Sequence, residues 1–68
     1  MKLQINGEEH DLADGLSLAT LLERLGMKPD RVAVELNREI VRREAWAQTR
    51  LQAGDRLEIV QFVGGGLT

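Results

Sequence analysis

Residues 56–66 read RLEIVQFVGGG, a strand-like segment that runs directly into three glycines. Its first eight residues combine β-branched, aromatic and alternating polar side chains, which predicts a β-strand. One face of this strand carries Leu57, Ile59 and Val63, and the other carries Val60 and Phe62. A strand with apolar residues on both faces is either buried on both sides or exposes a patch to a partner. The glycines lack a Cβ, so residues 64–66 can enter a channel too narrow for other residues.

The chain before this strand begins with a predicted hairpin and a helix. Residues 1–5 alternate apolar and polar, and Asn6-Gly7 suits a type I′ turn into a polar edge strand over residues 8–12. Ser17 is a predicted N-cap, Leu16 a hydrophobic staple against Leu21, and Gly26 a left-handed C-cap. The helical stripe consists of Leu18, Leu21, Leu22 and Leu25.

The middle of the chain predicts a second strand pair. Pro29 ends any helix, residues 31–36 favour a strand, and Asn37-Arg38 is a turn into a strand over residues 39–41. Residues 42–48, which include Trp46, predict one or two helical turns over the end of the core, and residues 53–55 predict a turn.

These elements predict a two-layer α+β domain. A hairpin cannot bury a leucine stripe alone, so the helix must lie across a mixed sheet of four or five strands. We expect the first and last strands to be central parallel neighbours. Residues 1–63 then form the domain, and residues 64–68 form a glycine tail.

Composition excludes several classes of function. The chain has 68 residues and no cysteine, which rules out disulfides, thiolate metal sites and a cysteine nucleophile. A net charge of −2 and only two aromatic residues argue against nucleic-acid binding. No basic leader or long apolar run is present, so we expect a cytoplasmic monomer that meets no membrane.

No side chain stands out as catalytic or metal-binding. His10 is flanked by Glu9 and Asp11, but neighbours on a strand point to opposite faces and do not converge. Ser17 fits a helix cap better than a nucleophile. The acidic run of Glu8, Glu9, Asp11 and Asp14 is typical of a solvated edge.

Five motifs, in order, resemble the ThiS family of sulfur carriers, which have the ubiquitin-like β-grasp fold. They are residues 6–9 (NGEE), Leu21-Leu22 with Leu25-Gly26, residues 31–37 (RVAVELN), residues 54–60 (GDRLEIV) and residues 62–66 (FVGGG). The likeness covers residues 1–66. It implies that the chain is a substrate rather than an enzyme, and that it binds no cofactor itself.

The resemblance also implies the chemistry of the tail and the partners. An adenylyltransferase similar to ubiquitin-activating enzymes uses ATP and Mg²⁺ to adenylate the carboxylate of Gly66, which follows Gly64 and Gly65 in the tail. A sulfur donor enzyme then converts it to a thiocarboxylate, and a thiazole synthase takes the sulfur for thiamin. Val60 and Phe62 are our candidates for partner docking, with a core role for Phe62 as the alternative.

The chain departs from the family pattern after Gly66. Leu67 and Thr68 follow, so the glycine carboxylate is an amide until they are removed. Related carriers lose short extensions to a JAMM-type metalloprotease, which is therefore a further implied partner; otherwise the two residues are not native. The mature end is Gly66 or Gly65, and we favour Gly66.

Three functions remain open from the sequence. The first is a carrier for thiamin thiazole. The second is a carrier for molybdopterin, cysteine or methionine synthesis. The third is a β-grasp interaction module whose tail has no chemistry.

Overall fold

A computed structural model of the chain describes residues 1–62. The predicted end of the last strand at Val63 and the whole tail over residues 64–68 lie outside the described residues. The boundary between domain and tail therefore stays a prediction.

The predicted strands and the helix are all present. The elements, with η for a 3-10 helix, are β1 Lys2–Ile5, β2 Glu8–Asp11, α1 Leu18–Arg24, η1 Pro29–Arg31, β3 Val32–Leu36, β4 Glu39–Val41, η2 Arg43–Gln48 and β5 Arg56–Gln61. The sequence did not predict η1. Proline is tolerated in the first turn of a helix, where its missing N–H costs nothing, so Pro29 begins this short turn instead of preventing it.

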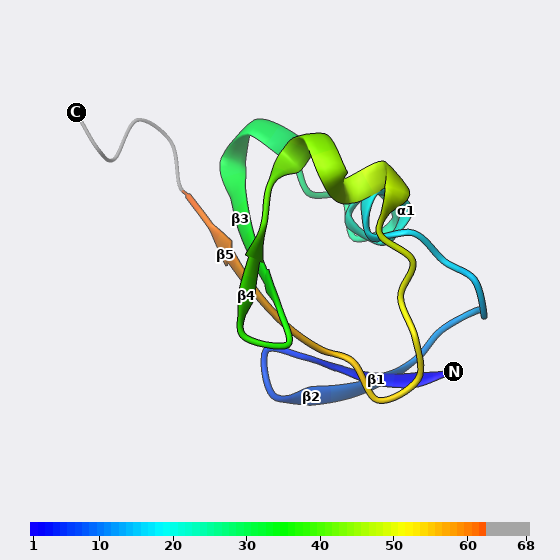
Figure 1. Cartoon of the computed structure of the whole chain (residues 1–68). Helices are drawn as coiled ribbons and strands as arrows, with labels where there is room; N and C mark the ends of the chain where they lie inside the picture. The colour runs from blue at the N-terminus through cyan, green and yellow to red at the C-terminus, as the bar shows by residue number, and fades with distance from the viewer. Residues whose placement is uncertain (63–68) are drawn as a thin grey trace.

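The strands form one mixed sheet in the order β2-β1-β5-β3-β4. Strand β5 is central, parallel to β1 and antiparallel to β3, as the sequence predicted for the first and last strands (Figure 1). Strand β2 is at an edge, which fits its polar sequence. The architecture is the α+β, β-grasp arrangement expected from the sequence.

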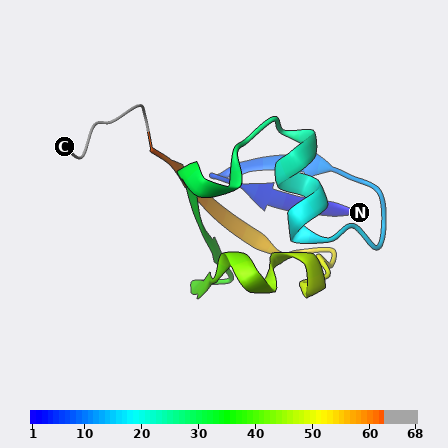
Figure 2. The ribbon, with the colours of Figure 1, turned by 90° about the horizontal axis from the view of Figure 1, so that it is seen from above.

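The helices α1 and η2 lie on one side of the sheet and enclose the core (Figure 2). Alternation along the strands places Leu3, Val34 and Leu57 inward, and each is at most 2% exposed. They meet Leu18, Leu21, Leu22 and Trp46 from the helical layer. Trp46 is 4% exposed, and its indole Nε1 donates a hydrogen bond of 2.9 Å to the carbonyl of Val41.

Both predicted ends of α1 are confirmed, but one leucine of the stripe was wrongly placed. The Ser17 hydroxyl accepts a 3.1 Å hydrogen bond from the Thr20 N–H, and Gly26 has φ +74°. Leu25, predicted to be on the buried stripe, is 40% exposed. The helix has only seven residues, so the fourth leucine falls at the C-cap position, past its last full turn.

Two asparagines at positive φ hold β5 from either side. Asn6 extends the β1–β5 ladder: its Nδ2 donates to the Ile59 carbonyl at 3.2 Å, and its Oδ1 accepts from the Ile59 N–H at 2.7 Å. On the β3 side, Asn37 Oδ1 accepts from the Arg56 N–H at 2.9 Å. Both asparagines have φ 51°, a conformation that Asn tolerates better than most residues. The side chains therefore complete the hydrogen bonding of β5 where the neighbouring strands end.

Loss of the Asn6 side-chain hydrogen bonds should destabilise the fold even when the backbone conformation at this position is unchanged. Replacing Asn6 with glycine keeps the positive φ but leaves the N–H and C=O of Ile59, itself 7% exposed, without these partners. We expect the free energy of unfolding to fall by about 2 kcal/mol in urea denaturation. Arg38→Gly is the matched control, because Arg38 also has positive φ (72°) but makes no side-chain hydrogen bond within residues 1–62. Equal effects of the two substitutions would contradict this role of Asn6.

The amino terminus is tied to the loop after β2. The Met1 ammonium lies 3.2 Å from Asp14 Oδ1 and 3.3 Å from Asp11 Oδ1, and also donates to the Leu12 carbonyl. The hydrogen bond to Asp14 is the main cause of a raised pKa for this ammonium, supported by Asp11 and opposed by burial. The carboxylates favour the charged form, so folding and protonation of this group reinforce each other.

Stability should therefore decline at alkaline pH through this group. Its pKa is higher in the folded than in the unfolded protein, where it is near 8.0. The stabilisation from the charged ammonium is therefore fully present below the unfolded pKa of 8.0, and it is lost as the pH rises through the pKa of the folded protein. In thermal unfolding of a chain that starts at Met1, we expect the Tm to fall more steeply above pH 8 in the wild type than in Asp14→Asn. Parallel pH profiles would show that the contact contributes nothing.

Candidate functional site

The candidate site begins where β5 presents apolar side chains on the sheet face that the helices leave open. Val60 is 56% exposed and Phe62, directly after β5, is 44% exposed. The Phe62 N–H donates a 2.7 Å hydrogen bond to the Arg31 carbonyl, so the backbone there is held although the ring is not buried. Of the two sequence interpretations of this strand, the structure favours an exposed patch over burial on both faces.

Strand pairing brings two further apolar residues to this face. Ala33 on β3 lies opposite Val60, and Ile40 on β4, opposite Glu35, is 77% exposed. We call Ala33, Ile40, Val60 and Phe62 the apolar patch. A shallow hollow of about 100 Å³ within it is lined by Ala33, Val34, Glu35, Ile40, Glu58 and Val60. Exposed apolar residues gathered in this way are typical of a surface that meets another protein.

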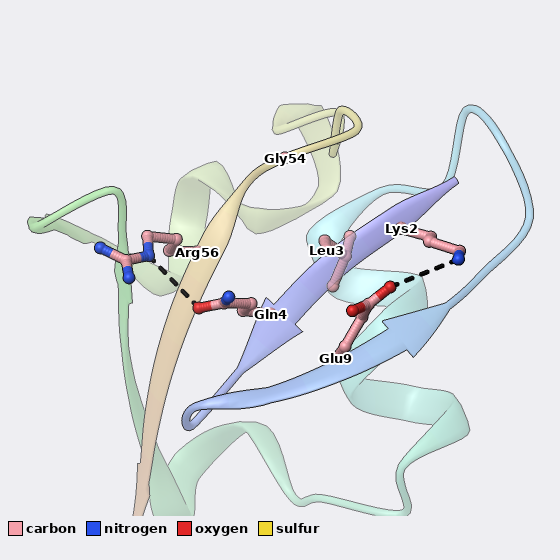
Figure 3. Close-up of a pocket in the computed structure, with 6 residues that line it drawn as sticks. All are labelled: Lys2, Leu3, Gln4, Glu9, Gly54 and Arg56. Carbon is pink, nitrogen blue, oxygen red and sulfur yellow. Dashed lines mark hydrogen bonds and ion pairs between the residues drawn. The ribbon is translucent and has the colours of Figure 1, made fainter.

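The other half of the open face is polar and internally paired. Figure 3 shows Lys2 on β1 forming an ion pair with Glu9 on β2, with Nζ 3.5 Å from Oε2. In the same view, Arg56 Nε donates to Gln4 Oε1 at 3.3 Å. The two halves of the face therefore differ in character, and the apolar half is the one next to the end of β5.

The side chains that resemble catalytic groups are not brought together. His10 is on β2, opposite Leu3, and its Nε2 lies 4.0 Å from Glu8 Oε1, while Glu9 faces the other side with Lys2. Ser17 caps α1. Within residues 1–62, no group of three or more His, Asp or Glu side chains is arranged to hold a metal ion. No helix in this part of the chain has the length and apolar character needed to cross a membrane.

The predicted site residues divide into two groups. Val60 and Phe62, two residues apart in the chain, are both exposed, as docking residues must be, and their docking role stays a proposal. Gly64, Gly65 and Gly66 lie outside the described residues. Sequence reasoning missed Ile40 and Ala33, because a three-residue strand has too little alternation to reveal its outer face, and alanine carries no pattern of its own.

Comparison with known proteins identifies the family of the chain. The sequence profile of the ThiS family matches residues 3–66. The chain is 35% identical over 66 residues to the sulfur carrier protein ThiS of Escherichia coli, covering 97% of this chain and 100% of that protein. A crystal structure of the thiamine biosynthesis protein ThiS from Geobacter metallireducens superposes with a TM-score of 0.83 at 38% identity, covering 97% of this chain and 100% of that one.

A larger relative contains a similar sequence as one part of its length. The chain is 48% identical over 66 residues to a thiazole synthase of Paramagnetospirillum magneticum, covering 97% of this chain but 20% of that protein. The family match spans nearly the whole chain, and the E. coli protein is matched over its full length. The chain belongs to the ThiS family.

Proposed function

We propose that this chain is a sulfur carrier protein of thiamin biosynthesis, and that Gly66 carries the sulfur as a thiocarboxylate. The observation that supports this most strongly is the family match over residues 3–66, which ends on the last of the three glycines. The named relative in E. coli, matched over its full length, is a sulfur carrier protein.

The proposed chemistry takes place on the tail in two displacements. A carboxylate resists nucleophilic attack, so the Gly66 carboxylate first attacks the α-phosphorus of ATP and displaces pyrophosphate. Hydrosulfide released by the sulfur donor enzyme then attacks the acyl carbon of the adenylate. The new C–S bond forms as AMP leaves with the electron pair of the C–O bond, and loss of the S–H proton gives the thiocarboxylate. The partner enzyme supplies Mg²⁺ and the groups that stabilise the developing charge.

The folded body contributes position rather than catalysis. Strand β5 is held on both sides, by β1 with Asn6 and by β3, and it ends at one margin of the fold in both views (Figures 1 and 2). An enzyme acting on the residues after Phe62 must therefore contact this margin. We propose that Val60 and Phe62 dock that enzyme.

The relatives also suggest who receives the sulfur. A thiazole synthase contains a segment 48% identical to this chain, which supports a thiazole synthase as the acceptor. The remaining proposed partners are an adenylyltransferase similar to ubiquitin-activating enzymes, a sulfur donor enzyme, and a JAMM-type metalloprotease that exposes Gly66 by removing Leu67 and Thr68.

Adenylation should depend on where the chain ends. A form ending at Gly66 should release pyrophosphate from ATP with the activating enzyme of its own organism, whereas the 68-residue form should not until Leu67 and Thr68 are cut off. Intact mass spectrometry should then find one terminal oxygen replaced by sulfur. Deleting Gly66 from the processed form should abolish transfer without changing the Tm. Full activity of the 68-residue form, or none of the form ending at Gly66, would refute the proposal.

Docking by Phe62 should be visible in the KM of the activating enzyme for this chain, measured by pyrophosphate release. Phe62→Ser in the form ending at Gly66 should raise this KM about tenfold, because exposed aromatic residues at the centre of an interface account for much of its affinity. Leu25→Ser is the matched control, since Leu25 is exposed to a similar degree (40% against 44%) but is at the C-cap of α1. A KM equal to that of the control would assign Phe62 no part in docking.

A further inference from the structure

Two acidic side chains line the hollow in the apolar patch. Glu35 on β3 and Glu58 on β5 are directly opposite each other in the antiparallel pairing, and both are exposed. They line the same hollow as Ala33, Ile40 and Val60. Like charges directly opposite in a sheet repel, so this pair does not stabilise the fold.

Neither carboxylate forms an ion pair with another residue in the part of the chain that the structure describes. The ion pairs of the amino terminus, Lys2 and His10 use other carboxylates. Arg38 and Arg56 line an adjoining hollow of about 230 Å³ with both glutamates, yet neither forms an ion pair with them. This differs from the polar half of the face, where Lys2 and Glu9 neutralise each other (Figure 3).

The chemistry of the hollow specifies what fits it. Ala33 has a small side chain between the exposed Ile40 and Val60, which leaves room for an apolar group. The two carboxylates beside it form no ion pair within residues 1–62, so a guanidinium or ammonium group of a partner can pair with them. An apolar side chain with a neighbouring Arg or Lys complements both features, whereas an acidic or purely apolar surface leaves the carboxylates desolvated and unpaired.

We infer that this hollow docks the activating enzyme, which inserts an apolar side chain and places an arginine or lysine against Glu35 and Glu58. The inference rests on the proposed function. The four residues 63–66 span at most about 14 Å, so a surface near Phe62 lies close to the enzyme's ATP site. Such a site is rich in cationic groups that neutralise phosphates, which matches an acidic docking surface.

Neutral substitutions at Glu35 and Glu58 test the inference, because they should weaken docking while stability stays the same or increases. In the form ending at Gly66, Glu35→Gln with Glu58→Gln removes the repulsion, so the Tm should stay the same or rise. The KM for the carrier in pyrophosphate release by the activating enzyme should rise about tenfold at low salt. The wild-type KM should also increase with added salt, and this dependence should be weaker in the double variant.

The matched control is Glu23→Gln with Glu44→Gln, which makes the same change in net charge on α1 and η2, on the helical side of the sheet. Its KM and salt dependence should stay at the wild-type values. If the two double variants behave alike, or if the wild-type KM is insensitive to salt, the inference is overturned. That outcome still leaves the proposed function intact, whereas a wild-type chain that is never adenylated refutes the proposed function itself.

Discussion

The structure depends on the central position of β5. Its residues from Leu57 to Gln61 pair with β3, its first two residues also pair with β1, and the Asn6 side chain bonds Ile59 on the β1 side. A backbone bonded on both sides and packed through Leu57 and Ile59 into the core cannot shift without breaking many bonds at once. The backbone is therefore held in a defined place and direction as far as Phe62, which is what the proposed carrier role requires.

The helical layer covers only one face of the sheet, and the open face follows from that. Within residues 1–62, the seven-residue helix α1 and the short helix η2 bury apolar side chains against the inner face, whereas η1 contributes no buried residue. The outer residues of β1 and β2 are polar and pair among themselves, so that half needs no partner. The outer residues of β3, β4 and β5 beyond Arg56 include the apolar Ala33, Ile40 and Val60 and the acids Glu35 and Glu58, so we propose that this half contacts another protein.

Body and tail therefore divide the proposed work. The tail carries the reacting carboxylate and needs no side chain for its chemistry. No group of three or more His, Asp or Glu side chains in residues 1–62 is arranged to hold a metal ion, and we propose that the body acts through surface and position. In the proposed reaction, catalysis by the partner then depends on bringing a carboxylate oxygen to the α-phosphorus of ATP, a matter of orientation more than of reactivity in the carrier.

The sequence by itself determined the local structure and the family. The turns at Asn6-Gly7 and Asn37-Arg38, the cap at Ser17 and the alternation in β5 are short-range patterns, and the structure confirms them because each depends only on neighbouring residues. Tertiary structure alone decided which residues share a face. Leu25 left the core because α1 ends early, while Glu35 and Glu58 came face to face through the register of β3 and β5, strands twenty residues apart in the chain. No local pattern encodes such pairings, because register is set by the packing of the whole sheet against the core.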